Sequence, residues 1–291
     1  MKKYNSKLAF SLIEISVVIL IIGILVIGIT KGTRIIRASK LRTAQSLTNS
    51  SPVASMDGIL FWVEATLDKS FTASEIVDTP YGTNGTISIW NDINPQTTTP
   101  NSPTQGSAND KPRYKINAIN SLPALNFDGS SEYLNFNGSK LVNSNYSIFV
   151  VEQRRSSNLQ FFISGTDNGD NLRLSLGYRD TSNATFAQYG NDYDATVSAY
   201  SSPFPRIHSY RFSSTKGKNY NINGTDSAMF PSLCCSPPVA TQGLISFNGA
   251  MIAGGNFYNG DIGEIIIFNR YITDSERSFI EKYLKAKWGI K

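Results

Sequence analysis

The sequence predicts an N-terminal transmembrane α-helix, followed by an all-β two-sheet sandwich and a short C-terminal helix. Three observations support this fold class. An unbroken apolar stretch occupies residues 10–29, many short strand-like runs separated by turn residues follow it, and a helical pattern returns only near the C-terminus. Hydrophobic residues make up 40% of the 291 residues and charged residues only 17%. This composition is typical of a turn-rich β domain, and the length is ample for a sizeable core.

The apolar stretch reads FSLIEISVVILIIGILVIGI, and its only charge is at Glu14. At a rise of about 1.5 Å per residue, a helix of this length covers roughly the 30 Å hydrocarbon core of a bilayer. A secretory signal would have a shorter apolar region of about 7 to 15 residues and a small-residue cleavage site after it. We therefore expect a membrane span over 10–29, within a helix over 10–48 that ends in a linker over 49–56.

The formal net charge of +5 comes from the N-terminal region. Three lysines precede residue 10, five basic residues face one acidic residue over 10–52, and from Val53 onward 19 Lys and Arg face 21 Asp and Glu. Because cations lie on both sides of the span, the positive-inside rule leaves its orientation undecided. The remainder is slightly acidic, which argues against nucleic acid as a partner.

The residues before and within the span resemble the N-terminus of type IV prepilins and pseudopilins. A short basic leader ends in a small residue and is followed by the motif Phe10, Ser11, Leu12, Ile13, Glu14. The resemblance implies a leader over 1–9, and cleavage by a prepilin peptidase between Ala9 and Phe10 on the cytoplasmic side. It also implies N-methylation of Phe10. The family usually has Gly before the cleaved bond, where this chain has Ala9.

The same resemblance implies that Glu14 pairs with the N-terminal amine of a neighbouring subunit during assembly. A charged side chain at the centre of a bilayer costs at least about 2.5 kcal/mol unless it is paired or neutralised, so such a residue usually has a function. The alternative interpretation is a plain signal anchor in which Glu14 reaches the membrane interface.

Short strand-like runs dominate the chain after the linker. Leu172, Leu174 and Leu176 alternate with polar residues or glycine, as in a half-buried strand. Further strands are expected over 146–153, 159–164, 184–189 and 206–212. Residues 92–112 lack periodicity and predict a long loop. Near the C-terminus, a buried strand over 262–268 precedes a capping box of Thr273 and Glu276, which predicts the start of a helix.

Residues 57–291 resemble the concanavalin A-like, laminin G-like jelly-roll modules of bacterial surface proteins. The features that carry the resemblance are Trp62, Trp90-Asn91-Asp92, LPALNFDGSSEYL (122–134), and the closing helix that ends at Trp288 and Gly289. Many relatives hold calcium with loop Asp and Asn oxygens, and the resemblance implies Asp128, Asp192 and Asp194 as ligand candidates. The alternative is that these residues satisfy backbone groups within their turns.

The residues argue against an enzyme. Glycosidases need two carboxyl groups about 5 to 9.5 Å apart on either side of the sugar bond. The only candidates on one strand are Asp261 and Glu264, and a period of two places them on opposite faces. His208 is the only histidine, so we expect it to be a packed or rim residue and expect no catalytic triad. Zinc is disfavoured because Cys234 and Cys235 are the only cysteines and are adjacent.

Two further features leave alternatives open. The adjacent Cys234 and Cys235 can close a strained disulfide ring, stay free, or pair with another chain, and the sequence favours the first two together. Glycan binding would use exposed aromatic faces, for which the residue types available are Trp90, Tyr133, Tyr189, Tyr193 and Tyr258.

We therefore expect a pilin-like subunit that is made as an inner-membrane precursor and then joins a type IV pilus or pseudopilus, in the periplasm or at the cell surface. Its expected partners are the prepilin peptidase, other pilin or pseudopilin subunits, and a glycan or surface protein bound by a lectin-like domain. The size of that domain suggests a minor subunit. The alternatives are a type II secretion-like pseudopilin whose sandwich binds protein, and a membrane-anchored glycan hydrolase.

Overall fold

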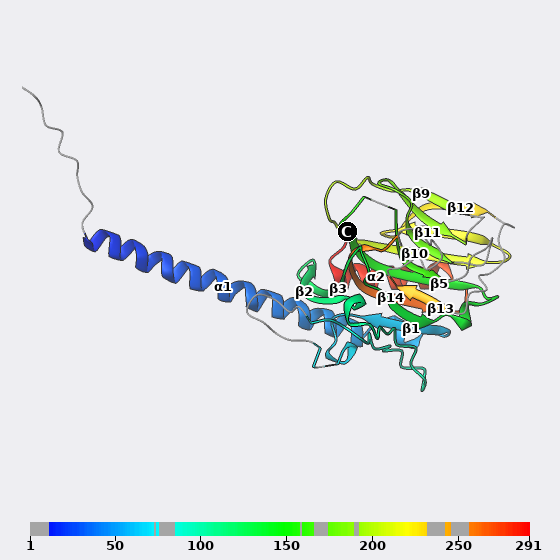
Figure 1. The fold of residues 1–291 in the computed structure, drawn as a ribbon, viewed down its shortest axis with the longest axis horizontal. Coiled ribbons are helices and arrows are strands. Elements are labelled where there is room, and N and C mark those ends of the chain that lie inside the picture. Colours follow the sequence, from blue (N-terminus) through cyan, green and yellow to red (C-terminus); the bar gives the residue numbers. More distant parts are fainter. Residues whose placement is uncertain are drawn as a thin grey trace, which may run out of the picture. The chain divides into compact units, whose positions relative to one another are not determined.

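The computed structural model describes residues 12–72, 74–75, 85–157, 159–165, 174–188, 192–231, 242–245 and 256–291. The chain divides into two compact units, Met1–Arg42 and Thr43–Lys291. Figure 1 shows the helix that runs through the first unit and the strands that build the second. The predicted fold class is confirmed: a long apolar helix, two antiparallel sheets packed as a sandwich, and a short C-terminal helix.

The long helix α1 (Leu12–Asn49) is 38 residues long and continuous, so Gly32 does not interrupt it. It is long and apolar enough to cross a membrane, judged by its length and composition. Its large apolar side chains are exposed, for example Leu12 at 88% and Ile29 at 65%. Exposed apolar area costs roughly 25 cal/mol per Å² in water, so this surface requires an apolar surrounding.

The second unit consists of two sheets. The eight-stranded large sheet has the order β12-β11-β10-β5-β14-β3-β2, with β1 paired to β14. Its strands are β1 (Ile59–Glu64), β2 (Arg113–Ile119), β3 (Leu122–Asp128), β5 (Tyr146–Arg154), β10 (Arg206–Ser213), β11 (Gly217–Ile222), β12 (Thr225–Pro231) and β14 (Asn259–Phe268).

The six-stranded small sheet has the order β4-β13-β6-β7-β8-β9. Its strands are β4 (Leu134–Asn137), β6 (Gln160–Gly165), β7 (Ser175–Tyr178), β8 (Asn183–Ala187), β9 (Tyr193–Thr196) and β13 (Gln242–Ile245). Single-turn 3₁₀ helices are η1 (Pro52–Ser55), η2 (Asp68–Ser70), η3 (Ala108–Asp110) and η4 (Ser139–Leu141). The strands predicted over 146–153, 159–164, 184–189 and 206–212 correspond to β5, β6, β8 and β10. Of the alternating run that starts at Leu172, residues 172–173 lie outside the described residues, and the strand observed there is β7.

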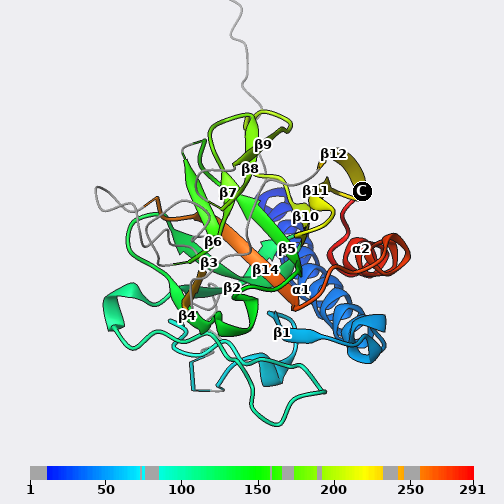
Figure 2. The ribbon, with the colours of Figure 1, turned by 90° about the vertical axis from the view of Figure 1, so that its right-hand side faces the viewer.

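The large sheet is buried on both faces, because alternate side chains of its strands enter two different cores. On β5, Ile148 and Val150 point between the sheets, whereas Phe149 and Val151 point to the outer face of the large sheet. The helix α2 (Asp274–Trp288) covers that outer face. Figure 2 shows α2 on the side of the large sheet that faces away from β6, β7 and β8.

The predicted capping box starts α2: the Thr273 hydroxyl accepts a hydrogen bond from the Glu276 N–H, and the Glu276 carboxylate accepts from the Thr273 N–H. Gly289 ends the helix with a φ of 63°, a left-handed conformation that favours glycine.

A β-bulge in β14 changes which residues share a face. The register with β5 shifts between Ile262 and Glu264. Ile262 and Ile265 both enter the core between the sheets, so Asp261 and Glu264 both lie on the outer face. The prediction that they lie on opposite faces is therefore wrong, because the strict period of two fails at a bulge. Gly263 is needed there, since a Cβ would lie 2.5 Å from the Trp288 ring.

Candidate functional site

A row of polar side chains crosses the outer face of the large sheet. Arg113, Asn126, Asp261 and Gln153 are direct cross-strand neighbours on β2, β3, β14 and β5. Their faces follow from alternation, because the adjacent Tyr114, Leu125 and Ile262 all enter the core between the sheets. Arg155 follows β5 and completes the group, which we call the polar row.

Asp261 is the buried anion of the polar row, with no exposed surface. One of its carboxylate oxygens accepts a 2.8 Å hydrogen bond from the Asn126 amide. The other accepts two from Arg155, of which the Nε bond is 3.0 Å long. The Arg155 side chain remains 35% exposed. The buried Asp261 carboxylate thus fixes the position of the partly exposed Arg155 guanidinium.

The last residue of β3, Asp128, and Glu132 in the turn that follows add two carboxyl groups at the Arg113 end of the row. Glu132 is 4% exposed, and its Oε2 accepts a 2.8 Å hydrogen bond from the Asp128 N–H. Its Oε1 lies 3.6 Å from Arg113 Nε. Burial, together with the nearby Asp128 charge, raises the pKa of Glu132 to about 7.

Asp128 has the opposite shift. Burial raises the pKa of Asp128, but hydrogen bonds from Ser130 and Ser131 outweigh it and hold the pKa below its usual value. Two neighbouring carboxyl groups whose pKa values are pushed apart are a common feature of acid–base sites. At neutral pH, Asp128 is ionised while Glu132 is close to half protonated.

The other calcium candidates have a cation as their partner. Arg179 donates to Asp192 at 2.5 Å and to Asp194 at 3.2 Å. Asp128 accepts the Ser130 N–H at 2.8 Å within its own turn. In the described part of the chain, no three or more His, Cys, Asp or Glu side chains are grouped so that they could hold a metal ion.

A second polar cluster lies between the two sheets and includes His208. His208 and Glu152 both have no exposed surface, and His208 Nε2 lies 2.9 Å from Glu152 Oε1. The same carboxylate oxygen accepts the Tyr178 hydroxyl at 2.6 Å, and the other oxygen accepts the Tyr258 hydroxyl. The Tyr220 hydroxyl lies 2.8 Å from His208 Nδ1. We call this group the interior network.

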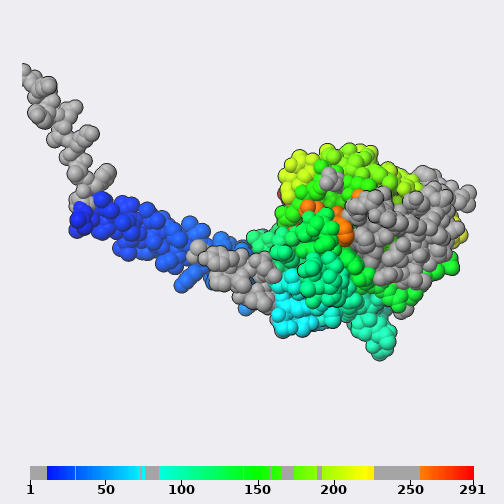
Figure 3. Space-filling view, in the orientation of Figure 1, coloured from blue at the N-terminus to red at the C-terminus, as the bar shows by residue number. Residues whose placement is uncertain are grey.

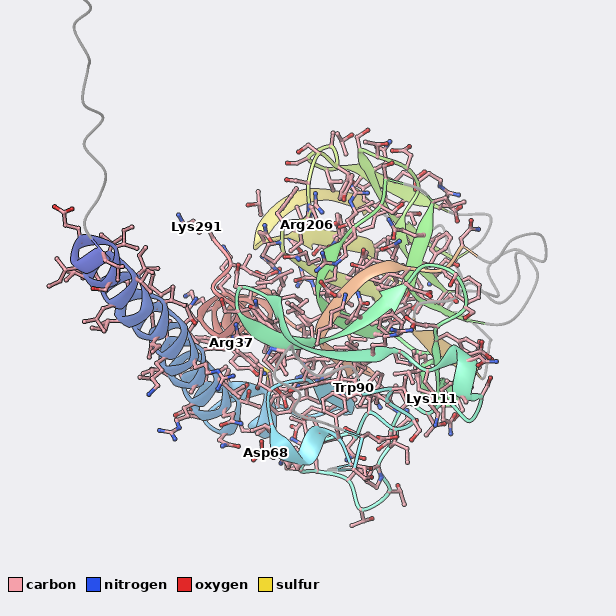
Figure 4. All side chains as sticks on the ribbon, turned by 60° about the vertical axis from the view of Figure 1, so that its left-hand side comes forward. Arg37, Asp68, Trp90, Lys111, Arg206 and Lys291 are labelled. Atoms are coloured by element: carbon pink, nitrogen blue, oxygen red, sulfur yellow. The ribbon has the colours of Figure 1, made fainter. Side chains whose placement is uncertain are left out.

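Two buried arginines lie within electrostatic reach of the Glu152 carboxylate. Arg206 donates to the Tyr178 hydroxyl at 3.2 Å, and the Arg154 guanidinium lies 3.9 Å from the centre of the Tyr178 ring. Figure 4 marks Arg206, at the start of β10. Burial lowers the pKa of His208 in spite of the Glu152 carboxylate, so the imidazole is neutral at pH 7. It then donates from Nε2 to Glu152 and accepts the Tyr220 hydroxyl at Nδ1.

A third cluster lies under α2. Lys287 Nζ is 2.8 Å from Glu64 Oε2 and 2.9 Å from Glu264 Oε2, and all three side chains are fully buried. Glu264 Oε2 also accepts a hydrogen bond from Trp288, and Glu264 Oε1 accepts hydrogen bonds from Trp62 and Tyr283. This buried ion-pair network links α2 to β1 and β14 of the large sheet.

The aromatic candidates for glycan binding divide by burial. Trp90 and Tyr258 are fully buried, and Trp90 Nε1 donates to the Glu64 carbonyl at 2.9 Å. They pack the core and offer no open face. Tyr133 and Tyr193 are partly exposed. The aromatic candidate Tyr189 lies outside the described residues. The disulfide candidates and the predicted cleavage site also lie outside them: Cys234, Cys235, Ala9 and Phe10.

Glu152, Glu132, Arg113 and Arg155 were not among the residues predicted from the sequence. A signal for Glu152 was present, because Ile148 and Val150 alternate toward Glu152 on a predicted strand and so place it on the core face. No local signal marks the polar row, since its members come from four strands.

No family model matches the chain, and no curated protein matches it. Solved structures share its fold. Trypanosoma rangeli sialidase, in complex with difluorosialic acid, aligns with 85% of this chain and 38% of its own length, at 12% identity and a TM-score of 0.51. A GH54 α-L-arabinofuranosidase aligns with 71% of this chain and 52% of its own length, at 14% identity and a TM-score of 0.53. At these identities the likeness shows the fold alone.

This comparison corrects the expectation that the chain is not an enzyme. Both similar structures belong to enzymes that act on glycosides, so the sandwich fold gives no ground for excluding catalysis. The predicted separation of Asp261 and Glu264 onto opposite faces gives no ground either, because the bulge in β14 places both side chains on one face. A screen with glycans therefore has to measure cleavage as well as binding.

Proposed function

We propose that the chain is a pilin-like subunit that α1 anchors in a bacterial inner membrane. The assembled subunit displays the sandwich as a glycan-recognition domain on a type IV pilus or pseudopilus. One observation carries the proposal. Glu14 is the only charge within an apolar segment of a continuous helix whose apolar side chains are exposed. A carboxyl group is rarely present in such an apolar segment without a function, and pairing with the amine of a neighbouring subunit is the function proposed for Glu14.

The second unit of the chain supports the proposed glycan recognition. Its fold is similar to structures of enzymes that act on glycosides. Its polar row combines exposed arginines with buried carboxyl and amide groups, which suits hydrogen bonding to sugar hydroxyl and acidic groups. The large size of this unit favours a minor or tip position, where it does not have to pack along the whole fibre.

The Glu14→Leu variant tests the assembly step. We expect it to be inserted and cleaved between Ala9 and Phe10, but to reach the sheared filament fraction about tenfold less, which corresponds to the loss of only about 1.4 kcal/mol of pairing. Mass spectrometry of the N-terminal peptide measures cleavage and methylation, and quantitative immunoblotting measures assembly.

Ser16→Ala is the matched control, because the Ser16 hydroxyl donates to the Ile13 carbonyl of its own helix at 2.8 Å. It should assemble normally. Retention of leader residues 1–9 in wild-type protein, or equal assembly of the two variants, would contradict the pilin-like assignment.

A glycan array probed with the full-length protein in detergent tests recognition. We expect specific binding to a subset of glycans, because the polar row presents hydrogen-bonding groups in a fixed arrangement. Mass spectrometry of bound glycans then separates binding from hydrolysis. Binding of secreted proteins by folded material that is silent on the array would replace glycan recognition by protein recognition.

A further inference from the structure

We propose that the outer face of the large sheet around Arg113, Lys115 and Arg155 binds the carboxylate of an acidic sugar. This inference rests on the proposed glycan recognition and adds the class of ligand. We call these three residues the cationic surface. Figure 3 shows the face of the sandwich on which the segment of β2 and β3 lies at the surface.

The three cations share one face of the sheet. Arg113 and Lys115 lie on either side of Tyr114, which enters the core between the sheets. Arg155 follows Arg154, whose guanidinium lies over the Tyr178 ring in the same core. Alternation therefore places all three side chains outward. Lys115 is also within electrostatic reach of Arg113 and Arg155, in addition to Asp261 and Glu132.

The cations are only partly neutralised. Asp261 is bonded to Arg155 through Nε and Nη2, which leaves that arginine 35% exposed. Arg113 is 57% exposed. Within the described part of the chain, its one ionic partner is Glu132, whose oxygen at 3.6 Å lies beyond hydrogen-bond distance. The Arg113 guanidinium therefore keeps donors for a planar, two-oxygen ligand such as a carboxylate.

Glu132 makes this surface sensitive to pH. The charged groups that face it are Asp128, at the end of β3, and Arg113 and Lys115, on β2. Because the pKa of Glu132 is about 7, its carboxyl is mostly neutral in mild acid, and Arg113 then loses its ion pair with Glu132, although the Asp128 carboxylate remains nearby. At higher pH the Glu132 carboxylate forms and competes with an anionic ligand for Arg113. Affinity for an acidic sugar should therefore decrease as the pH rises through 7.

Two matched pairs of probes test the ligand class: tetragalacturonate with its methyl ester, and sialyllactose with lactose. Calorimetric titration of the full-length protein in detergent, at pH 5.5 and 8, should show at least one acidic member binding about tenfold tighter than its neutral partner at the lower pH. The difference should shrink at pH 8.

Three variants locate the effect. Arg113→Ala should weaken binding of the acidic probe about tenfold and leave the neutral probe unchanged. Arg179→Ala removes a similarly exposed arginine that pairs with Asp192 and Asp194, and it should change neither. Glu132→Gln should keep the tighter binding at pH 8, because no carboxylate then competes for Arg113.

Equal affinity for acidic and neutral members of both pairs would overturn the inference and leave glycan recognition intact. Acid preference that survives Arg113→Ala, or that falls equally with Arg179→Ala, would overturn the location. A lack of binding to both acidic probes would overturn the ligand class, whereas the glycan array decides independently whether the protein recognises glycans.

Discussion

Lys287→Met is expected to lower the free energy of unfolding of the sandwich by about 3–5 kcal/mol, the usual cost of removing one partner from a buried ion pair. Lys287 Nζ lies within 2.9 Å of two buried carboxylates, those of Glu64 and Glu264. These two glutamates are direct neighbours across β1 and β14. Without the ammonium group, two negative charges face each other in a site that water does not reach.

Urea unfolding of the full-length protein in detergent, followed by tryptophan fluorescence, measures this effect, because Trp62, Trp90 and Trp288 are all buried in the second unit. Lys282→Met is the control, since Lys282 is an exposed residue of the same helix. It should change the free energy of unfolding by less than about 0.5 kcal/mol. Equal effects of the two substitutions would show that Lys287 does not balance the carboxylates.

Local patterns were sufficient to predict much of the fold. The span of α1, the strands bounded by turn residues, and the capping box of α2 each depend on neighbours within a few residues along the chain. The two-sheet sandwich followed from the number of short strands. These features need no knowledge of distant contacts.

The polar clusters depend on contacts that are distant in sequence. Lys287 and Glu64 are 223 residues apart, and Glu152 and His208 are 56 apart. The need for glycine at the Gly263 bulge is also not evident locally, because the ring that a Cβ would meet there belongs to Trp288 of α2. Sequence reasoning therefore named Asp261 and Glu264 but assigned them the wrong relative faces, and it found His208 without its carboxylate partner.

The interior network predicts the second large effect. Glu152→Gln is expected to lower the free energy of unfolding by about 3–5 kcal/mol, because it leaves Arg154 and Arg206 buried without the nearby anion. It also replaces an acceptor of three hydrogen bonds, from Tyr178, Tyr258 and His208. The same urea experiment at pH 6 measures it. Glu132→Gln is the matched control, and it should cost less than about 1 kcal/mol because the Glu132 carboxyl is already mostly protonated there.

The pH dependence of this difference gives a signed test. Burial raises the pKa of Glu152, but the hydrogen bond from His208 and the charge of Arg206 outweigh it and hold the pKa below the usual 4.5. Its contribution is therefore complete above about pH 4.5 and is lost as the pH falls through the lower, folded-state value. The raised pKa of Glu132 changes stability with pH in the opposite direction. Because wild type and Glu152→Gln both contain Glu132, this effect cancels when their free energies of unfolding are subtracted. The stability gap between wild type and Glu152→Gln should thus narrow below about pH 4.5. A gap that stays constant into stronger acid would mean that Glu152 is not the ionised centre of the network.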